Sequence, residues 1–281
     1  MRHMILAASA ALTLTALAPL ASAQDARPDT AADTAEGVDL GLFLGTGYNY
    51  SSGKYGTTTT TTIQSAPLLA SVEYGDLSVD LTVPFLNVNG DPNVIPGVGR
   101  VVNKNPKKRS KAGTATGSAS GIGDVVAEAT WDAYTNDAYK FGFSLSGKVK
   151  FGTGDKSQGL GDGATDYSVG LGAFKTFGPL TLTADVGYTA LGSSNYIALK
   201  KNLMTYSVGA LYRASDKVSL GLSYDAGGQA ALGISGTTTR ELTAFAAYKL
   251  AKHWKLQGYG LAGFSDGSPD FGGGASLKYA F

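Results

Sequence analysis

The sequence predicts an all-β fold: a transmembrane, antiparallel, up-and-down β-barrel of about 12 strands. Three observations predict it: an export signal, a composition rich in glycine and tyrosine without long apolar runs, and repeated alternation of apolar and polar residues up to the C-terminus. Alternation with a period of two places the apolar residues on one face of a strand. Closing such strands into a barrel leaves no unpaired backbone edge in lipid.

Residues 1–23 are predicted to be a cleavable signal peptide. The start is positive, residues 5–17 are uncharged, and 21–23 form the small-residue cleavage site Ala-Ser-Ala. The apolar run is too short for a spanning helix, which needs about 20 apolar residues. We expect the mature chain to begin at Gln24, with a flexible arm over 24–37 and the barrel over 38–281.

Composition excludes several classes of protein. Glycine occurs 39 times in 281 residues, and tyrosine (15) outnumbers phenylalanine (11); this glycine share is about twice the usual one. The absence of cysteine excludes disulfides and thiolate metal sites. Once Arg2 leaves with the signal peptide, basic and acidic residues are equal in number, so total charge indicates no nucleic-acid partner.

Strands are predicted wherever apolar and polar residues alternate. In 139–151, apolar residues from Tyr139 to Phe151 fall on one face, and Lys140, Lys148 and Lys150 fall on the other. The same pattern predicts strands near 38–50, 66–75, 77–87, 121–133, 139–151, 164–177, 179–191, 203–214, 217–227, 238–250, 254–264 and 270–281.

The connections alternate between tight turns, such as Tyr74-Gly75-Asp76 and Gly178-Pro179, and longer links, such as 88–120. Outer-membrane barrels have short periplasmic turns and longer external loops. With an even strand count, both termini are expected in the periplasm of a Gram-negative bacterium. The last strand alternates up to the terminal aromatic Phe281, which resembles the segment that the barrel-assembly machinery recognises during insertion.

If the apolar faces meet lipid, many charged residues face the lumen, because charges are costly on the lipid side. They include the candidate pore-lining residues Asp124, Glu128, Asp132, Lys140, Lys148, Lys150, Asp185, Arg213, Asp225 and Glu241. One interpretation is that they pair as structural ladders; the other is that they line a wet passage and orient a polar solute. Because same-face residues of adjacent strands meet, we expect Glu128 and Asp132 to reach Lys140 or Lys148.

Glycines on the polar faces, among them Gly170 and Gly209, keep side-chain volume in the lumen low or relieve crowding where strands bend. Eight strands are filled by side chains and sixteen leave a wide channel, so about 12 strands suit a narrow pore.

The 88–120 link is predicted to be an external basic loop without acids between its cations. These cations are Arg100, Lys104, Lys107, Lys108, Arg109 and Lys111. The loop is either a solvated segment, a contact for lipopolysaccharide phosphates, or an attractor of anions toward the pore.

No enzymatic or cofactor site is predicted. The two histidines are His3, in the signal peptide, and His253, in a predicted periplasmic turn, so no Ser-His dyad can form on the outer side. We predict no resident metal; Asp162, Asp166, Asp266 and Asp270 could hold calcium loosely, although turn chemistry explains them equally well.

Three segments resemble the outer-membrane transporter family named after the meta-pathway of phenol degradation: 148–154 (KVKFGTG), 160–167 (LGDGATDY) and 184–188 (ADVGY). The resemblance extends over roughly 123–281, and Gly152 stands where the family usually has proline. It implies a barrel that passes small organic molecules, often aromatic or hydrophobic. We therefore expect a passive uptake channel whose partners are a small-molecule solute, outer-membrane lipid and lipopolysaccharide. The alternative is a structural or surface-interaction barrel with a plugged lumen.

The basic loop provides a test of sidedness. Neutralising Lys107, Lys108 and Arg109 together should leave folding intact, because no predicted strand residue changes. Protease added to whole cells should cut at this cluster and spare the strands. Cleavage only after the outer membrane is breached would reverse the assignment of inside and outside.

Overall fold

The computed structural model describes residues 40–101, 116–228, 230 and 238–281. The predicted signal peptide and arm, and five of the six cations of the basic loop, lie outside the described residues. Among the residues that are described, no helix is long and apolar enough to cross a lipid bilayer.

Twelve antiparallel strands form one closed barrel, as the alternation predicted. Its strands are β1 (Leu40–Gly53), β2 (Thr61–Tyr74), β3 (Leu77–Gly90), β7 (Val125–Asn136), β8 (Phe141–Phe151), β9 (Asp166–Phe177), β10 (Leu180–Ala190), β11 (Asn202–Arg213), β12 (Val218–Gly228), β13 (Thr238–Ala251), β14 (Trp254–Gly263) and β15 (Phe271–Ala280). Each pairs with its neighbours in chain order, apart from short insertions between β3 and β7.

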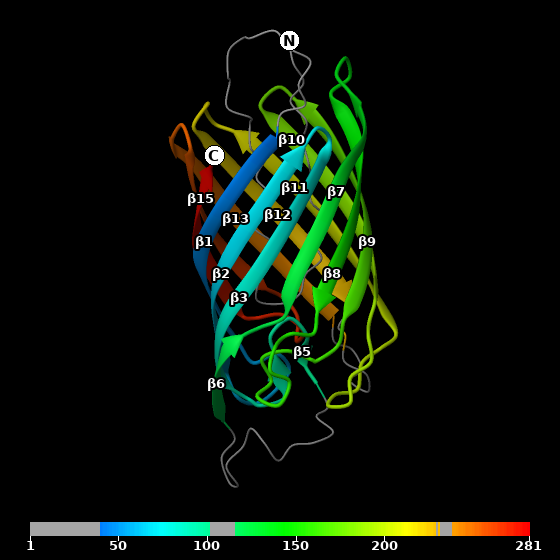
Figure 1. Ribbon diagram of the computed structural model, residues 1–281, viewed down its shortest axis with the longest axis vertical. Coiled ribbons are helices and arrows are strands. Elements are labelled where there is room, and N and C mark those ends of the chain that lie inside the picture. Colours follow the sequence, from blue (N-terminus) through cyan, green and yellow to red (C-terminus); the bar gives the residue numbers. More distant parts are fainter. Residues whose placement is uncertain (1–39, 102–115, 229, 231–237) are drawn as a thin grey trace.

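Pairing of the first strand with the last closes the barrel. The register of β1 with β15 extends from Phe43 opposite Ala280 to Ser52 opposite Phe271. The C-terminus lies at the upper end of the barrel in Figure 1, and the segments that follow β3 lie at the lower end. We refer to these as the short-turn end and the long-loop end.

Two of the tight turns show why the sequence places glycine there. Gly75 and Gly178 each have a φ of 59° and each is the first of the two residues between paired strands. A type II′ hairpin turn requires a positive φ at this position, which glycine adopts without steric cost. The tight turns predicted at these places are therefore confirmed.

The 88–120 link is more structured than the sequence predicted. Strand β3 continues to Gly90, and three short strands follow: β4 (Val94–Ile95), β5 (Gly99–Arg100) and β6 (Gly117–Ile122). Strands β4 and β5 pair with each other, and β6 pairs with the end of β3. The expectation of one long loop without strands over 88–120 was wrong for the described residues, because the glycine- and serine-rich β6 lacks the alternation of apolar and polar side chains that marks a strand.

The outer and inner walls differ as the alternation predicted. Large apolar side chains such as Leu68, Phe85 and Tyr167 are exposed on the outer wall, whereas their chain neighbours point inward. Aromatic residues gather near the short turns, where His253, Trp254 and Phe281 surround Tyr279 with ring centroids 4.9–5.6 Å away. Such a ring of aromatics is typical of a membrane–water interface.

Barrel closure can be tested in this chain because it contains no cysteine. Tyr48 and Ala275 are exposed on the outer wall and lie directly opposite each other on β1 and β15. The pair Tyr48→Cys and Ala275→Cys should therefore form a disulfide on oxidation, detected as faster migration of the denatured chain on a gel. In the matched control, Tyr48→Cys with Leu277→Cys, the residues are diagonal and should cross-link poorly. Equal cross-linking of both pairs would contradict the register.

Candidate transport pathway

The inner wall is made largely of small and polar side chains. At two of its glycines, the aromatic ring of a residue on the neighbouring strand packs over the glycine. Phe245 lies directly opposite Gly221, and its ring occupies the space where a Cβ of Gly221 would be, 2.1 Å from the nearest ring atom. Phe174 covers Gly142 in the same way. The rings therefore cover the wall at these glycines, which favours the interpretation that they relieve crowding.

One predicted ion pair is present in the wall. Lys148 Nζ on β8 lies 3.2 Å from Glu128 Oε2 on β7, and the two residues are directly opposite each other in the register. Asp80 of β3 lies opposite Glu128 on its other side and accepts a hydrogen bond from Ser71 Oγ at 2.7 Å. The expected coupling between the acidic residues of this strand and Lys148 is confirmed for Glu128.

The structure does not bring Asp132 and Lys140 together. Lys140 is exposed in the turn between β7 and β8, where it has a φ of 51°, because β8 begins only at Phe141. Asp132 faces inward near the short-turn end, and its backbone N–H donates to the carbonyl oxygen of Asp76 at 2.9 Å. Arg213, another candidate for the lumen, is exposed at the end of β11.

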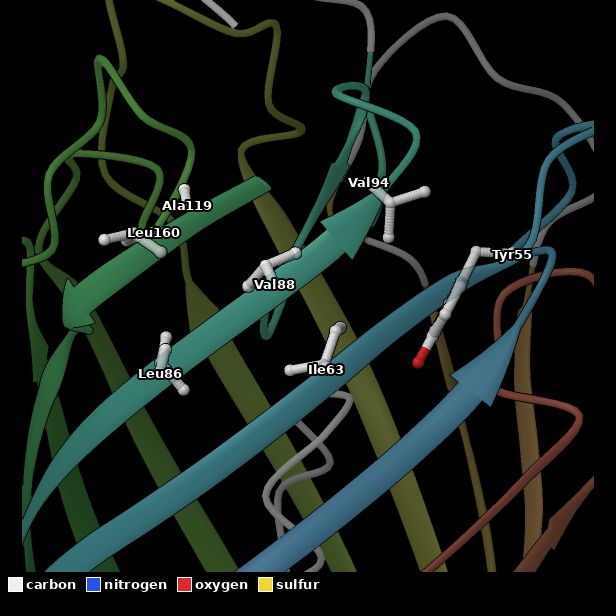
Figure 2. Packing of buried hydrophobic residues seen from close by; sticks show 7 residues of the cluster. All are labelled: Tyr55, Ile63, Leu86, Val88, Val94, Ala119 and Leu160. Carbon is white, nitrogen blue, oxygen red and sulfur yellow. The ribbon is translucent and has the colours of Figure 1, made fainter. Parts of the chain in front are cut away.

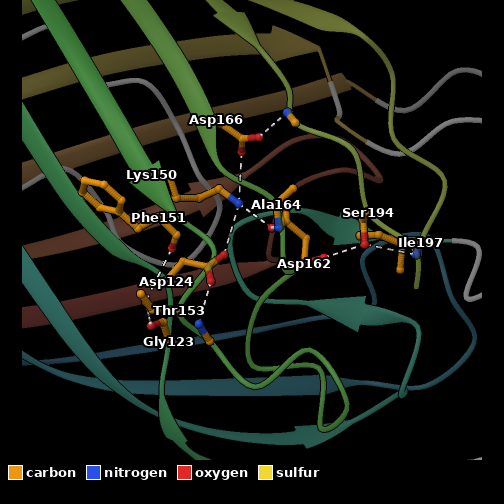
Figure 3. A network of polar contacts seen from close by, with 12 residues as sticks. Gly123, Asp124, Lys150, Phe151, Thr153, Asp162, Ala164, Asp166, Ser194 and Ile197 are labelled. Carbon is orange, nitrogen blue, oxygen red and sulfur yellow. Dashed lines mark hydrogen bonds and ion pairs between the residues drawn. The ribbon is translucent and has the colours of Figure 1, made fainter.

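Lys150 is the centre of the densest charged cluster in the described part of the chain (Figure 3). Its Nζ lies 3.1 Å from Asp124 Oδ2, 2.6 Å from Asp162 Oδ1 and 3.0 Å from Asp166 Oδ2. The lysine is 2% exposed, and the three acids come from the residue just before β7, from the loop after β8 and from the start of β9. Sequence analysis named Asp124 and Lys150 as candidate pore-lining residues, but it did not predict that Asp162 and Asp166 would pair with Lys150.

The same acids hold loop backbone at the long-loop end. Asp124 Oδ1 accepts the N–H of Gly154 at 2.9 Å, and Asp166 Oδ1 accepts the N–H of Gly192 at 2.8 Å. Asp162 Oδ1 accepts the N–H of Ala164, and its carbonyl oxygen accepts Ser194 Oγ at 2.6 Å. Through these bonds the Lys150 cluster joins two loops to the barrel wall, which explains Asp162 and Asp166 without calcium.

Three further acids form a row across neighbouring strands. Asp185 on β10, Ser207 on β11, Asp225 on β12 and Glu241 on β13 are successive register partners. Asp225 and Glu241 are buried, and Asp225 Oδ2 accepts a hydrogen bond from Ser223 Oγ at 3.0 Å. The row gathers three carboxyl groups on this part of the inner wall.

Apolar residues from β2, β3, β4, β6 and two loops pack together at the long-loop end. This first loop cluster consists of Tyr55, Ile63, Leu86, Val88, Val94, Ala119 and Leu160, and Figure 2 shows it between β2, β3 and the loops. Tyr55 is the largest of these side chains; its hydroxyl lies 3.1 Å from Ser51 Oγ, and burial raises the pKa of its phenol above the ordinary value.

A second loop cluster joins the β4–β5 hairpin to the loops after β10 and β12. It consists of Ile95, Val98, Val101, Ile197 and Ala230. Arg100, the one cation of the predicted basic loop that the structure describes, donates from Nη1 to the carbonyl oxygen of Gly56 at 2.7 Å. Sequence reasoning missed both clusters, although the apolar residues of 94–101 are the signal that could have revealed this folded segment.

The lysine cluster generates a stability prediction. Lys150→Met should destabilise the barrel by about 3–5 kcal/mol, because it leaves three buried carboxylates without their cation. Lys148→Met is the matched control on the same strand and face; it removes a pair with one acid and should have the smaller effect. Urea unfolding of the purified barrel, followed by tryptophan fluorescence and gel mobility, would measure both. Equal destabilisation would contradict the central role of Lys150.

Comparisons with known proteins agree with this architecture. A family model described as "Putative MetA-pathway of phenol degradation" matches residues 26–281, so it extends well before residue 123, where the resemblance by motif begins. No curated protein sequence matches the chain significantly.

Solved structures with this fold are outer-membrane barrels. A KdgM porin in complex with disordered oligogalacturonate has a TM-score of 0.50 at 11% identity, over 84% of this chain and 99% of that one. The toluene transporter TbuX of Ralstonia pickettii has a TM-score of 0.39 at 12% identity, over 87% of this chain and 89% of that one. At such identities the likeness to the porin shows the fold alone.

Proposed function

Since the chain belongs to the family described as the putative MetA-pathway of phenol degradation, we propose that it is a passive outer-membrane channel for small organic solutes. The observation that carries this proposal is the closed barrel itself, with an apolar outer wall and an inner wall of small and charged side chains. An apolar outer wall suits lipid, and a polar inner wall suits a wet passage. The family description supports aromatic or hydrophobic molecules among the solutes.

The proposed orientation follows from the lengths of the connections. Short turns lie at the end where β15 ends, and long loops lie at the other. We place the short-turn end in the periplasm and the long-loop end outside, as in other barrels of this kind. Lipopolysaccharide would then surround the long-loop end.

A structural barrel with a closed lumen is the second candidate. It is favoured by the packing at the long-loop end, where the two loop clusters and the Lys150 cluster fix several loops over the wall. A loop arrangement held by so many contacts restricts the size of any solute that enters from that side. The two candidates differ in whether the purified barrel conducts ions.

The purified protein should show discrete conductance steps in planar bilayers and should let liposomes swell in arabinose. Ser207→Arg, which adds a long side chain to the inner wall, should lower single-channel conductance by about half. Val208→Phe changes the next residue, which faces outward, and should leave conductance unchanged. A barrel that migrates as a folded protein on a gel, but shows neither conductance in planar bilayers nor swelling of liposomes, would contradict the channel and favour the closed structural barrel.

A further inference from the structure

Charge is scarce on the outer wall of the barrel. On the lipid-facing sides of the twelve barrel strands, as far as the structure describes them, two positions carry a charged side chain: Lys175 on β9 and Arg240 on β13. Each is the third residue from an end of its strand, Lys175 at the short-turn end and Arg240 at the long-loop end. A charged side chain is costly against lipid tails, so both positions suit the depth of the headgroups.

Lys175 points away from the lumen. It shares its face of β9 with Tyr167, which is 61% exposed, whereas the preceding residue, Phe174, is buried. In the register, Lys175 lies directly opposite Phe141 on β8 and Leu182 on β10. The side chain of Lys175 is therefore on the outer wall, between two apolar neighbours.

Aromatic rings surround this lysine. Its Nζ lies 5.9 Å from the ring centroid of Phe141 and 5.5 Å from that of Phe177. The ring of Phe141 in turn packs against Tyr134 and Phe143, at centroid distances of 5.7 Å and 5.9 Å. Aromatic residues on the outer wall near the strand ends are typical of a membrane–water interface. We call Lys175, Tyr134, Phe141, Phe143 and Phe177 the Lys175 patch.

The hydrogen-bond donors of Lys175 are only partly used. An ammonium group has three N–H donors, and Lys175 Nζ donates to the carbonyl oxygen of Tyr139, in the turn before β8. Lys175 forms no ion pair with a carboxylate of the described residues. The ring faces attract the cation but supply no negative charge. The other donors of Lys175 are therefore available to an anionic group outside the wall.

At the depth of an aromatic belt, the anionic acceptor that lipid supplies is the phosphate of a headgroup. The long stem of Lys175 can lie along the apolar wall while its ammonium reaches that phosphate. Hydrogen bonds between an ammonium and phosphate oxygens are charge-assisted, and they are about twice as strong as bonds between neutral groups. A lipid with a net negative charge suits Lys175 better than a zwitterionic lipid, whose phosphate has a cation of its own.

We propose that the Lys175 patch binds one anionic phospholipid, in the leaflet that surrounds the short-turn end. The phosphate oxygens accept hydrogen bonds from Lys175 Nζ, and the acyl chains lie along the rings of Phe141 and Phe143. Under the proposed orientation this leaflet is the periplasmic one, whereas lipopolysaccharide surrounds the other end. The inference concerns the outer wall and goes beyond the proposed channel, because it does not depend on whether the lumen conducts.

The first experiment detects the lipid beside Lys175 in the full-length barrel, which contains no cysteine of its own. Leu182→Cys, directly opposite Lys175, takes a small fluorophore. Leu220→Cys is the matched control, because Leu220 is also the third residue of its strand and is 44% exposed against 43% for Leu182. In phosphatidylcholine vesicles with a small share of brominated phosphatidylglycerol, quenching at position 182 should exceed quenching at position 220 by about twofold or more. With brominated phosphatidylcholine instead, the two positions should be quenched equally.

Variants of the patch identify the cause of this excess quenching. Lys175→Gln should abolish the excess, and Lys175→Arg should keep it, because the positive charge is retained. Lys217→Gln removes an exposed lysine from the β11–β12 turn at the same end and should also keep it. Gel mobility selects the variants that fold. An excess that persists in Lys175→Gln, or equal quenching of both positions in the wild-type background, would overturn the site.

The second experiment measures lipid bound to the unlabelled barrel by native mass spectrometry. Lys175→Gln should lower the fraction of barrels that retain one phosphatidylglycerol by about threefold. Arg240→Gln, which removes the other outer-wall cation, should leave that fraction unchanged. Displacement of phosphatidylglycerol from the wild-type barrel by an equal concentration of lipid A would overturn the assignment to a phospholipid. None of these measurements depends on conductance, so a silent barrel would contradict the channel alone.

Discussion

Every strand of the barrel presents an apolar outer face, so each backbone N–H and C=O group needs a partner on a neighbouring strand. In lipid an unpaired backbone group costs several kcal/mol, and only a closed sheet avoids such groups at its edges. Pairing of β1 with β15 satisfies this constraint. Closure in turn fixes which face of each strand points into the lumen. Charged side chains are costly where they face lipid, so they lie on the inner wall.

The inner wall contains charges in two different arrangements. Some are compensated at short range: Lys148 pairs with Glu128, and Lys150 is surrounded by three carboxylates that also accept loop N–H groups. A buried ammonium needs such partners, because desolvation otherwise penalises its charge. These residues hold the wall and the loops together. Asp225 and Glu241 differ, because register places these two acids directly opposite each other on β12 and β13.

The two ends of the barrel therefore have different physical roles. At the long-loop end, apolar clusters and the Lys150 cluster fix loop segments, so access from that side depends on packing between loops. At the short-turn end the connections contain few residues and leave charged side chains of the wall facing the lumen.

Alternation by itself determined the twelve strands, their two faces and the tight turns at Gly75 and Gly178, because side-chain direction in a strand depends only on position along the chain. It also predicted the Glu128–Lys148 pair, whose strands are joined by a short turn. Only the tertiary structure decided that Asp162 and Asp166 meet Lys150, that residues 94–101 pack inside apolar clusters, and that Lys249, Lys255 and Lys278 share a row. These contacts depend on register and on loop paths, and both are set by the pairing of whole strands, which no local pattern of residues specifies.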